Sequence, residues 1–288
     1  MTGWLVVNNF IDSAKFSELY AFLENSAKRH GIKLLIKKTG ELMSVYEKDM
    51  RLPDFVLFWD KDIILAKRLE MMGARVFNSS SAIEICDNKA LTAIKLKELN
   101  IPTPKTYIAP KTFESVGYNS KEFLALSGED LGFPMIIKES FGSFGQQVYL
   151  ANDFSEAEKI IDKIGSKEFI MQEFISFSSG RDVRVNVVGD KVVSCMLRKS
   201  VTGDFRSNIS NGGVMEKFKL TSNIEELAVN TCKGLGLDFA GVDVLFLPDG
   251  KNMICEVNSN PHFKSSFDCT GIDVSDEIIK HIKTRCAN

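Results

Sequence analysis

The sequence lacks the cysteine and histidine spacings that mark metal sites, redox motifs and disulfide-rich folds. Its six cysteines lie far apart and form no CxxC pair, and most have apolar neighbours. We therefore expect small buried thiols in a reducing compartment. The three histidines, His30, His262 and His281, are too scattered to predict a catalytic triad or a zinc site.

Signals for membranes, polyanions and the commonest nucleotide folds are also missing. No apolar run is long enough to span a bilayer, and the first residues lack the charged flank of a signal peptide. The formal net charge is −2, so any anion site must be local. There is no GxxxxGK[ST] loop, no strand–GxGxxG–helix unit and no GxSxG. We expect a cytoplasmic globular protein with neither a membrane nor a nucleic-acid partner.

The first third of the chain alternates predicted strands and helices, a pattern typical of a parallel α/β sheet. A further helix, capped by Asp87, is expected to run to about Leu99 and to stop before Pro102 and Pro104. We place the first boundary at this proline pair. The predicted strands are residues 4–7, 33–36, 55–58 and 75–77, with helices at 13–30 and before Gly73.

The pattern changes to hairpins from Phe133 onward, after a stretch at 105–131 that is hard to assign. Strands with a glycine loop between them are followed by a helix at about 155–164 and another strand. Two more hairpins, a helix near 225–235 and a closing helix from about Asp276 complete the chain. No internal repeat is present.

The most informative segment is a predicted hairpin with an Asp-Gly turn at Asp249 and Gly250. A two- or four-residue loop there places Asp243 opposite Glu256, with Asn258 one same-face step further, whereas a three-residue loop shifts the register. The two carboxylates would repel, and this stripe carries no cation among its apolar neighbours. A hard cation such as Mg²⁺, which also holds phosphate oxygens, would relieve the repulsion. The alternative is a solvent-facing polar stripe.

A second segment has a lysine late on a buried strand, followed by a glycine-bearing turn. Gly142 and Gly145 allow close approach of the backbone to phosphates, and Lys138 supplies a point charge. An ordinary glycine hairpin with an edge lysine fits the same pattern. Lys89 reaches the same region from the start of a helix, although by itself it is a solvated first-turn lysine.

Two further strands carry polar groups. The strand 169–175 ends in a loose Ser-rich joint, where an adenine could bind the main chain, or it is simply a core strand. In the next strand Asp182, Arg184 and Asn186 share one face. A polar loop with Arg206 and several amides follows; an arginine fork suits phosphate or carboxylate, but surface decoration is equally compatible.

Taken together and in this order, these segments resemble the ATP-grasp superfamily, specifically its RimK-like glutamate ligase branch. The resemblance covers roughly Asp87 to Val274 and more loosely the whole chain. Its most specific stretches are GRDVRVNVVGDKVV, GDFRSNISNGG, GVDVLF, ICEVNSNP and TGIDV. It implies an α/β fold with α+β lobes: an N-terminal parallel α/β (pre-ATP-grasp) domain at 1–103, an ATP-grasp N-lobe with the glycine loop at 104–175, and a C-lobe with the metal site at 176–288.

The resemblance also implies roles for individual residues. Phosphates would contact Lys89 and Lys138 and be covered by Gly142, Ser143 and Gly145, while adenine would be held by Gln172, Glu173, Phe174 and Ile175. The nucleoside would be served by Glu173 and Asp182, and the phosphate and substrate end by Arg206, Ser207 and Asn208. Two metal ions, Mg²⁺ or Mn²⁺ in its place, would be bound by Asp243, Glu256 and Asn258. The catalytic side chains would be Arg198, Arg206 and Asn208.

The activity implied is ATP-dependent amide-bond formation between a carboxylate and an amine through an acyl phosphate. Arg198 or Arg206 would stabilise the tetrahedral oxyanion. The implied partners are ATP, an amino acid with glutamate favoured, and a peptide, protein or small-molecule co-substrate; dimers and tetramers occur in such families. Two alternatives are a phosphotransferase on the same fold and a non-catalytic ATP-binding regulatory module.

One position departs from the family pattern. Many relatives have Asn-x-x-Pro-Gly where this chain has Asn258-Ser-Asn-Pro261-His262. If the resemblance holds, the bulkier, titratable His262 lies near the acceptor amine, or it packs on Phe263 as an ordinary loop histidine.

Overall fold

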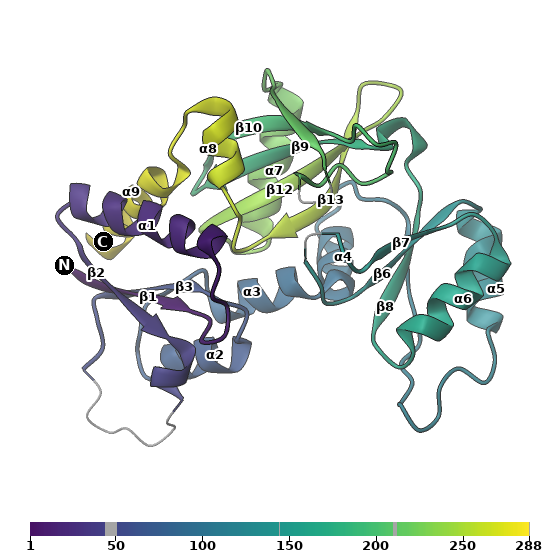
Figure 1. Ribbon diagram of the computed structural model, residues 1–288, viewed down its shortest axis with the longest axis horizontal. Helices are drawn as coiled ribbons and strands as arrows, with labels where there is room; N and C mark the ends of the chain where they lie inside the picture. The colour runs from purple at the N-terminus through teal and green to yellow at the C-terminus, as the bar shows by residue number, and fades with distance from the viewer. Residues whose placement is uncertain (44–50, 144, 210–211, 288) are drawn as a thin grey trace.

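The computed structural model describes residues 1–43, 51–143, 145–209 and 212–287. Three sheets organise these residues, and the segments of the N- and C-terminal ends lie side by side (Figure 1). The mixed α/β class and the sequence of a parallel sheet followed by antiparallel sheets are confirmed.

The first sheet is parallel and has the strand order β2-β1-β3-β4. The inner strand β3 is buried along its whole length. Its side chains are apolar on both faces of the sheet, so both faces can be covered by other apolar groups. Helices cover the two faces, and the four predicted strands and two predicted helices are confirmed. The elements are β1 (Thr2–Val7), α1 (Ala14–Arg29), β2 (Lys33–Lys38), η1 (Thr39–Leu42), β3 (Phe55–Trp59), α2 (Ile63–Met71) and β4 (Val76–Phe77).

The predicted helix cap at Asp87 is wrong. Asp87 is the last residue of α3 (Ser80–Asp87), and the chain turns extended at Asn88 before α4 (Lys89–Glu98) begins. Asn88 Oδ1 accepts hydrogen bonds from the backbone N–H groups of Ala90 at 2.9 Å and Leu91 at 3.3 Å, so Asn88 is the cap. Asp87 instead forms an ion pair with Lys61.

The second sheet, of order β5-β8-β6-β7, forms a lobe with a core of its own. Two helices pack on one side of it, and Figure 1 shows this lobe on the far side of the molecule from α1 and α9. The stretch that the sequence left unassigned contains one short strand and one helix. The elements are β5 (Thr106–Ile108), α5 (Glu122–Leu131), β6 (Met135–Glu139), β7 (Val148–Ala151), α6 (Phe154–Ile164) and β8 (Phe169–Glu173).

The third sheet is antiparallel and has the order β11-β10-β9-β12-β13. It contains the two predicted hairpins, and the apolar face of α7 packs on it. The elements are η2 (Ser176–Ser178), β9 (Arg181–Val188), β10 (Lys191–Lys199), β11 (Val214–Lys217), α7 (Ser222–Gly234), β12 (Phe239–Phe246) and β13 (Asn252–Asn258).

The C-terminal segment returns to the first sheet. It contains α8 (Lys264–Thr270), which the sequence did not predict, and α9 (Val274–Ala287), which begins two residues before the expected Asp276. One hydrophobic core joins Phe263 and Ile278 of this segment to Leu23 of α1. The domain limits at 103 and 175 remain predictions. The hydrophobic cores of the first and third sheets each contain residues from before 103 and from after 175.

Within the described ranges, no helix combines the length and the apolar character needed to cross a membrane.

Candidate active site

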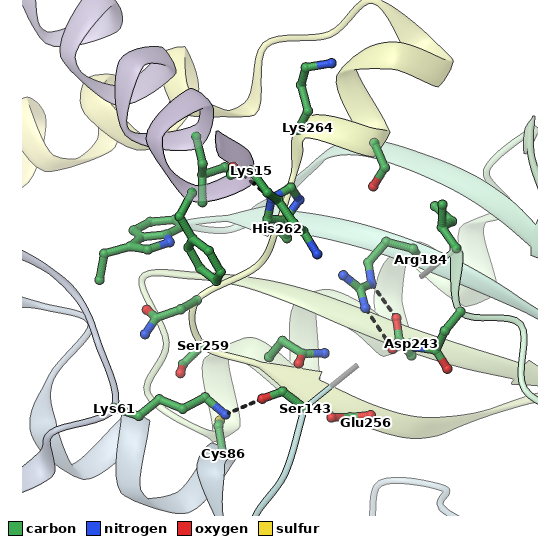
Figure 2. Close-up of a pocket in the computed structure, with 18 of the residues that line it drawn as sticks. Lys15, Lys61, Cys86, Ser143, Arg184, Asp243, Glu256, Ser259, His262 and Lys264 are labelled. Atoms are coloured by element: carbon green, nitrogen blue, oxygen red, sulfur yellow. Dashed lines mark hydrogen bonds and ion pairs between the residues drawn. The ribbon is translucent and has the colours of Figure 1, made fainter. Parts of the chain in front are cut away.

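A cavity of about 560 Å³ lies where the three sheets meet. Side chains from every part of the fold line it, including Lys15 of α1, Lys61 after β3, Lys89 of α4 and Ser143 of the glycine loop. Figure 2 shows Lys61, Ser143 and Glu256 at one end of this cavity and Lys15 and His262 at the other. The position of the cavity between sheets explains why cations distant in sequence converge on it.

The predicted hairpin and the pairing of Asp243 with Glu256 are confirmed, but the loop that contains Asp249 and Gly250 does not have the expected length. Leu247 N–H donates to the Lys251 carbonyl at 3.0 Å, which closes a three-residue loop and shifts the ladder by one residue near the turn. A bulge at Cys255 then restores the register, because Val244 faces Ile254 while Asp243 faces Glu256. The carboxylates therefore meet only because β13 holds one extra residue.

The expectation that no cation accompanies these carboxylates is also wrong. Strand β9 lies on the other side of β12 and places Arg184 directly opposite Asp243. The Arg184 guanidinium binds both carboxylate oxygens, with Nη2 2.9 Å from Oδ2 and a shorter contact from Nε to Oδ1. A metal ion is thus not needed to neutralise Asp243 in the folded protein.

Arg198 of β10 extends this pairing into a buried network. Its guanidinium donates to Asp182 at 2.6 and 2.7 Å and lies 3.0 Å from Asp243, and Ser207 donates to Asp182 at 2.7 Å. Burial opposes ionisation of Asp243, but Arg184 and Arg198 outweigh it and lower the pKa of Asp243. The network is charged and fully paired.

The lysines on the glycine-loop side have neutral partners. Lys138 is only 7% exposed, and its ammonium donates to Gln172 Oε1 at 2.7 Å. Lys89 is half-buried, not solvated as its sequence context suggested, and donates to the Gly142 carbonyl at 3.3 Å. Burial lowers the pKa of Lys89, although nearby Glu256 opposes this.

Two further cations hold the glycine loop. Lys61 donates to Ser143 Oγ at 3.3 Å, and Arg206 donates to the Gly145 carbonyl at 2.8 Å while pairing with Asp204 at 2.7 Å. Residues 144 and 210–211, which belong to two of the predicted motifs, lie outside the described residues. The loop of the second sheet is therefore contacted from the part of the chain before it, through Lys61 and Lys89, and from the third-sheet part, through Arg206.

The structure divides the predicted site residues into two groups. The large cavity is lined by Lys89, Gly142, Ser143, Arg198, Asn208, Asp243, Glu256 and Asn258, and a smaller adjoining one by Lys138 and Gln172 together with Lys89 and Glu256. The others do not line the large cavity: Gly145, Glu173, Phe174, Ile175, Asp182, Arg206 and Ser207. Among these, Phe174 packs edge-on against Phe205, with ring centroids 6.4 Å apart.

Sequence reasoning missed Lys15 and Lys61 as cavity residues. Both follow the carboxyl end of a parallel strand, Lys15 after β1 and Lys61 directly after β3. Since ligands of open parallel sheets bind at these ends, that position was a usable signal. Arg184 was recognised only as one member of a polar face, because its partner strand is not adjacent in sequence.

The donor set of the β12–β13 hairpin fits a hard cation. Asp243, Glu256 and Asn258 all line the cavity and supply oxygen ligands. The three arginine contacts leave about one of the roughly four acceptor sites of the Asp243 carboxylate for a cation. No group of three or more His, Cys, Asp or Glu suited to a metal occurs among the described residues, so phosphate oxygens would have to complete the coordination.

Comparison with protein-family models gives one match, to the RimK-like ATP-grasp domain, over residues 86–282. The chain belongs to the RimK-like ATP-grasp family. The matched residues span α4, both ATP-grasp sheets and most of α9, so the family match includes the glycine loop and the carboxylate hairpin.

Relatives in sequence include a protein named as a glutamate ligase and a protein named as a synthase. The chain is 34% identical to the probable alpha-L-glutamate ligase of Trichodesmium erythraeum, over 76% of this chain and 71% of that protein. It is also 34% identical to human N-acetylaspartylglutamate synthase A, over 78% of this chain but only 56% of that protein. The chain thus spans little more than half the length of the human synthase.

Solved structures support the ATP-grasp fold. The RimK domain protein of Sphaerobacter thermophilus superimposes with a TM-score of 0.76 at 19% identity, covering 98% of this chain and 99% of that one. The D-alanine–D-alanine ligase of Bacillus anthracis in complex with ATP gives a TM-score of 0.75 at 18% identity, covering 100% and 97%. A third solved structure, the ATP-grasp ligase PsnB in complex with a precursor variant, Mg and ADP, gives a TM-score of 0.72 at 17% identity, covering 98% of each chain.

Proposed function

We propose that this RimK-like ATP-grasp protein is an ATP-dependent ligase that joins a carboxylate to an amine through an acyl phosphate. The carrying observation is the arrangement of two adjoining cavities, in which Lys89 and Lys138 donate to neutral oxygens and the Asp243–Glu256 hairpin supplies carboxylates. Cations without carboxylate partners favour phosphate, and the acidic hairpin favours the ion that accompanies phosphate.

ATP would bind between the second and third sheets. Lys89 and Lys138 would contact the phosphates of ATP. Gly142, Ser143 and Gly145 would cover these phosphates, because the two glycines carry no side chain and let the backbone approach closely. Further nucleotide contacts are proposed for Gln172, Glu173, Phe174, Ile175, Asp182, Arg206, Ser207 and Asn208. A phosphate oxygen offers Lys89 a charged acceptor in place of the Gly142 carbonyl, which strengthens the contact.

Two Mg²⁺ ions would be held by Asp243, Glu256 and Asn258. Mn²⁺ could take the place of Mg²⁺. When bound, the ions would neutralise charge on the transferred phosphoryl group. Arg184 and Arg198 keep the Asp243 carboxylate ionised and fixed, so the direction of its remaining acceptor site is fixed by the sheet.

The reaction has two steps. A substrate carboxylate oxygen attacks the γ-phosphorus, the bond to ADP breaks, and an acyl phosphate forms. An amine then attacks the acyl carbon, and inorganic phosphate leaves as the amide forms. Arg198 lines the cavity and is proposed to stabilise the oxyanion, together with Asn208. Arg206 holds the Gly145 carbonyl, which suits a role in keeping the glycine loop over the reacting groups.

The substrates would be an amino acid, glutamate first, and a peptide, protein or small-molecule partner. The support is that two relatives, which match over three quarters of this chain or more, are named as an N-acetylaspartylglutamate synthase and a probable alpha-L-glutamate ligase. A homo-oligomer and a cytoplasmic location are further proposals from the family.

The decisive measurement is ADP release with Mg²⁺ across amino acids, singly and paired with candidate carboxylates and peptides. We expect sustained release only when both a carboxylate and an amine are present, because a closed site protects the acyl phosphate from water. Steady release with one substrate, unchanged by any amine, would indicate a phosphotransferase. No release with any pair would indicate a binding module, and either result overturns the ligase proposal.

A further inference from the structure

A row of polar side chains crosses the second sheet and ends at the smaller cavity. Thr106 of β5 lies directly opposite Gln172 of the inner strand β8. On the other side of β8, Gln172 faces Ile136, and Lys138 is two residues further along the same strand β6. Residues that face each other, or that lie two apart along one strand, share a face of the sheet. Thr106, Gln172 and Lys138 are therefore neighbours on one face, although they come from three different strands.

Thr106 sets the orientation of the Gln172 amide. The Thr106 hydroxyl donates its proton to the Pro104 carbonyl at 2.7 Å, so towards Gln172 its oxygen can only accept. It accepts a hydrogen bond from Gln172 Nε2 at 2.8 Å. This contact turns the amide oxygen Oε1 towards Lys138. A reversed amide would place two acceptors together at Thr106 and two donors together at Lys138.

The Lys138 ammonium receives its direction from this amide. The lysine is buried, and it donates to Gln172 Oε1 at 2.7 Å. The other acceptor printed in its surroundings is the Cys255 sulfur, 3.9 Å away, and a thiol is a weak acceptor. An ammonium has more N–H bonds than these two contacts use, so one is left for a phosphate oxygen. A single strong contact within the protein thus decides where that N–H bond points.

We propose that Thr106 is a positioning residue for nucleotide binding, which acts through the Gln172 amide on the Lys138 ammonium. Thr106 lines neither of the two cavities that the described residues form, so it acts without touching ATP. The assignment rests on the proposed function in one respect, the contact between Lys138 and the phosphates. Loss of the Thr106 hydroxyl should therefore affect the phosphate end of the nucleotide and not the base.

The first test compares ATP and adenosine binding to the full chain by calorimetry with Mg²⁺ present. Thr106→Val removes the acceptor and keeps a β-branched side chain suited to a strand. ATP binding should weaken about fivefold in this variant, while adenosine binding stays unchanged. Thr106→Ser keeps the hydroxyl and should bind ATP within about twofold of the parent protein. Equal losses for ATP and adenosine in Thr106→Val would overturn the proposal.

Thr112→Val is the matched control. Thr112 is a half-buried threonine in the connection between β5 and α5, and its hydroxyl also donates to a backbone carbonyl, that of Gly117. It lines neither cavity and is not part of the polar row. We expect unchanged ATP binding in Thr112→Val. A loss as large as that of Thr106→Val would show that any missing hydroxyl in this lobe has the same effect, and would overturn a specific role for Thr106.

A double-mutant cycle tests the order of the contacts. In the Lys138→Ala background, Thr106→Val should cause no further loss of ATP affinity, because the group that Thr106 positions is gone. A further loss of about fivefold would show that Thr106 acts on ATP by another route, which would overturn the proposal.

The same variants separate this proposal from the ligase function. If Lys138→Ala weakens ATP binding and Thr106→Val does not, the positioning role is overturned and the proposed function stands. If both variants behave as expected but no pair of substrates releases ADP, Thr106 keeps its role and the ligase proposal is removed.

NMR of the Gln172 side-chain amide gives a test in the parent protein. The chain has three glutamines, Gln146, Gln147 and Gln172, so their side-chain amide signals can be assigned by substitution. We expect ATP to shift the Gln172 signals more than adenosine does, because a phosphate bound to the ammonium changes its hydrogen bond with Oε1. No shift beyond that caused by adenosine would overturn the proposal even if Thr106→Val does not fold.

Discussion

The cations of the third sheet and those of the glycine-loop side are both withdrawn from water, yet they have opposite partners. Arg184 and Arg198 meet the carboxylates Asp243 and Asp182, whereas Lys138 and Lys89 meet an amide oxygen and a backbone carbonyl. An arginine fork bound to two carboxylate oxygens is satisfied in charge and geometry. A lysine ammonium that donates to a neutral oxygen has a hydrogen-bond partner, but its charge is not paired with a carboxylate.

This difference indicates which cations are available to a ligand. Replacing a neutral acceptor by a phosphate oxygen adds a charge interaction, but replacing a carboxylate gains nothing. The cations of the third sheet are therefore largely neutralised by their own carboxylates, and the glycine-loop side is better suited to receive the phosphates of ATP. Three substitutions test the contrast.

Asp182→Asn should give the largest change. It leaves the Arg198 guanidinium, which is 5% exposed, short of one carboxylate partner, and we expect a loss of about 3–5 kcal/mol in the free energy of unfolding. Urea denaturation followed by circular dichroism would measure it. Asp204→Asn, which removes a half-buried pairing with Arg206, is the control and should cost about 1 kcal/mol or less. Similar losses for both would refute a special role for the buried network.

Glu256→Gln should affect turnover and not stability. Glu256 is the member of the carboxylate pair on the Lys89 side, and its loss would remove a proposed ligand of Mg²⁺. We expect ADP release to fall by about a hundredfold or more, with an unchanged melting temperature in the absence of magnesium. Near-normal ADP release would reject Glu256 as a metal ligand.

Lys138→Ala should give the smallest change of the three and should be selective for phosphates. ATP binding is expected to weaken about tenfold, while adenosine binding stays the same, because only the phosphates interact with the ammonium charge. Calorimetric titration of both ligands would show this. Equal losses for ATP and adenosine would mean that Lys138 supports the fold of the pocket through Gln172 and does not contact phosphate.

Much of the fold followed from local pattern. The continuous apolar run of β3 and the 3.6-residue periodicity of α1 predicted the elements of the first sheet, because the spacing of apolar side chains within one element indicates whether it is a strand or a helix. The same reasoning located the carboxylate hairpin. It failed at Asp87 and Asn88, where two helices meet without a glycine or proline to mark the break.

The sequence by itself determined that Asp243 and Glu256 belong to one hairpin, that a lysine precedes a glycine loop, and that the chain resembles the RimK-like ATP-grasp family. Only the tertiary structure decided that Arg184 neutralises Asp243, that a bulge at Cys255 restores the register, and that the His262 ring lies against the Lys15 backbone carbonyl. The first group depends on neighbours along the chain. The second depends on which strands and helices pack together, and the free energy of such packing is a sum over distant residues that no local pattern contains.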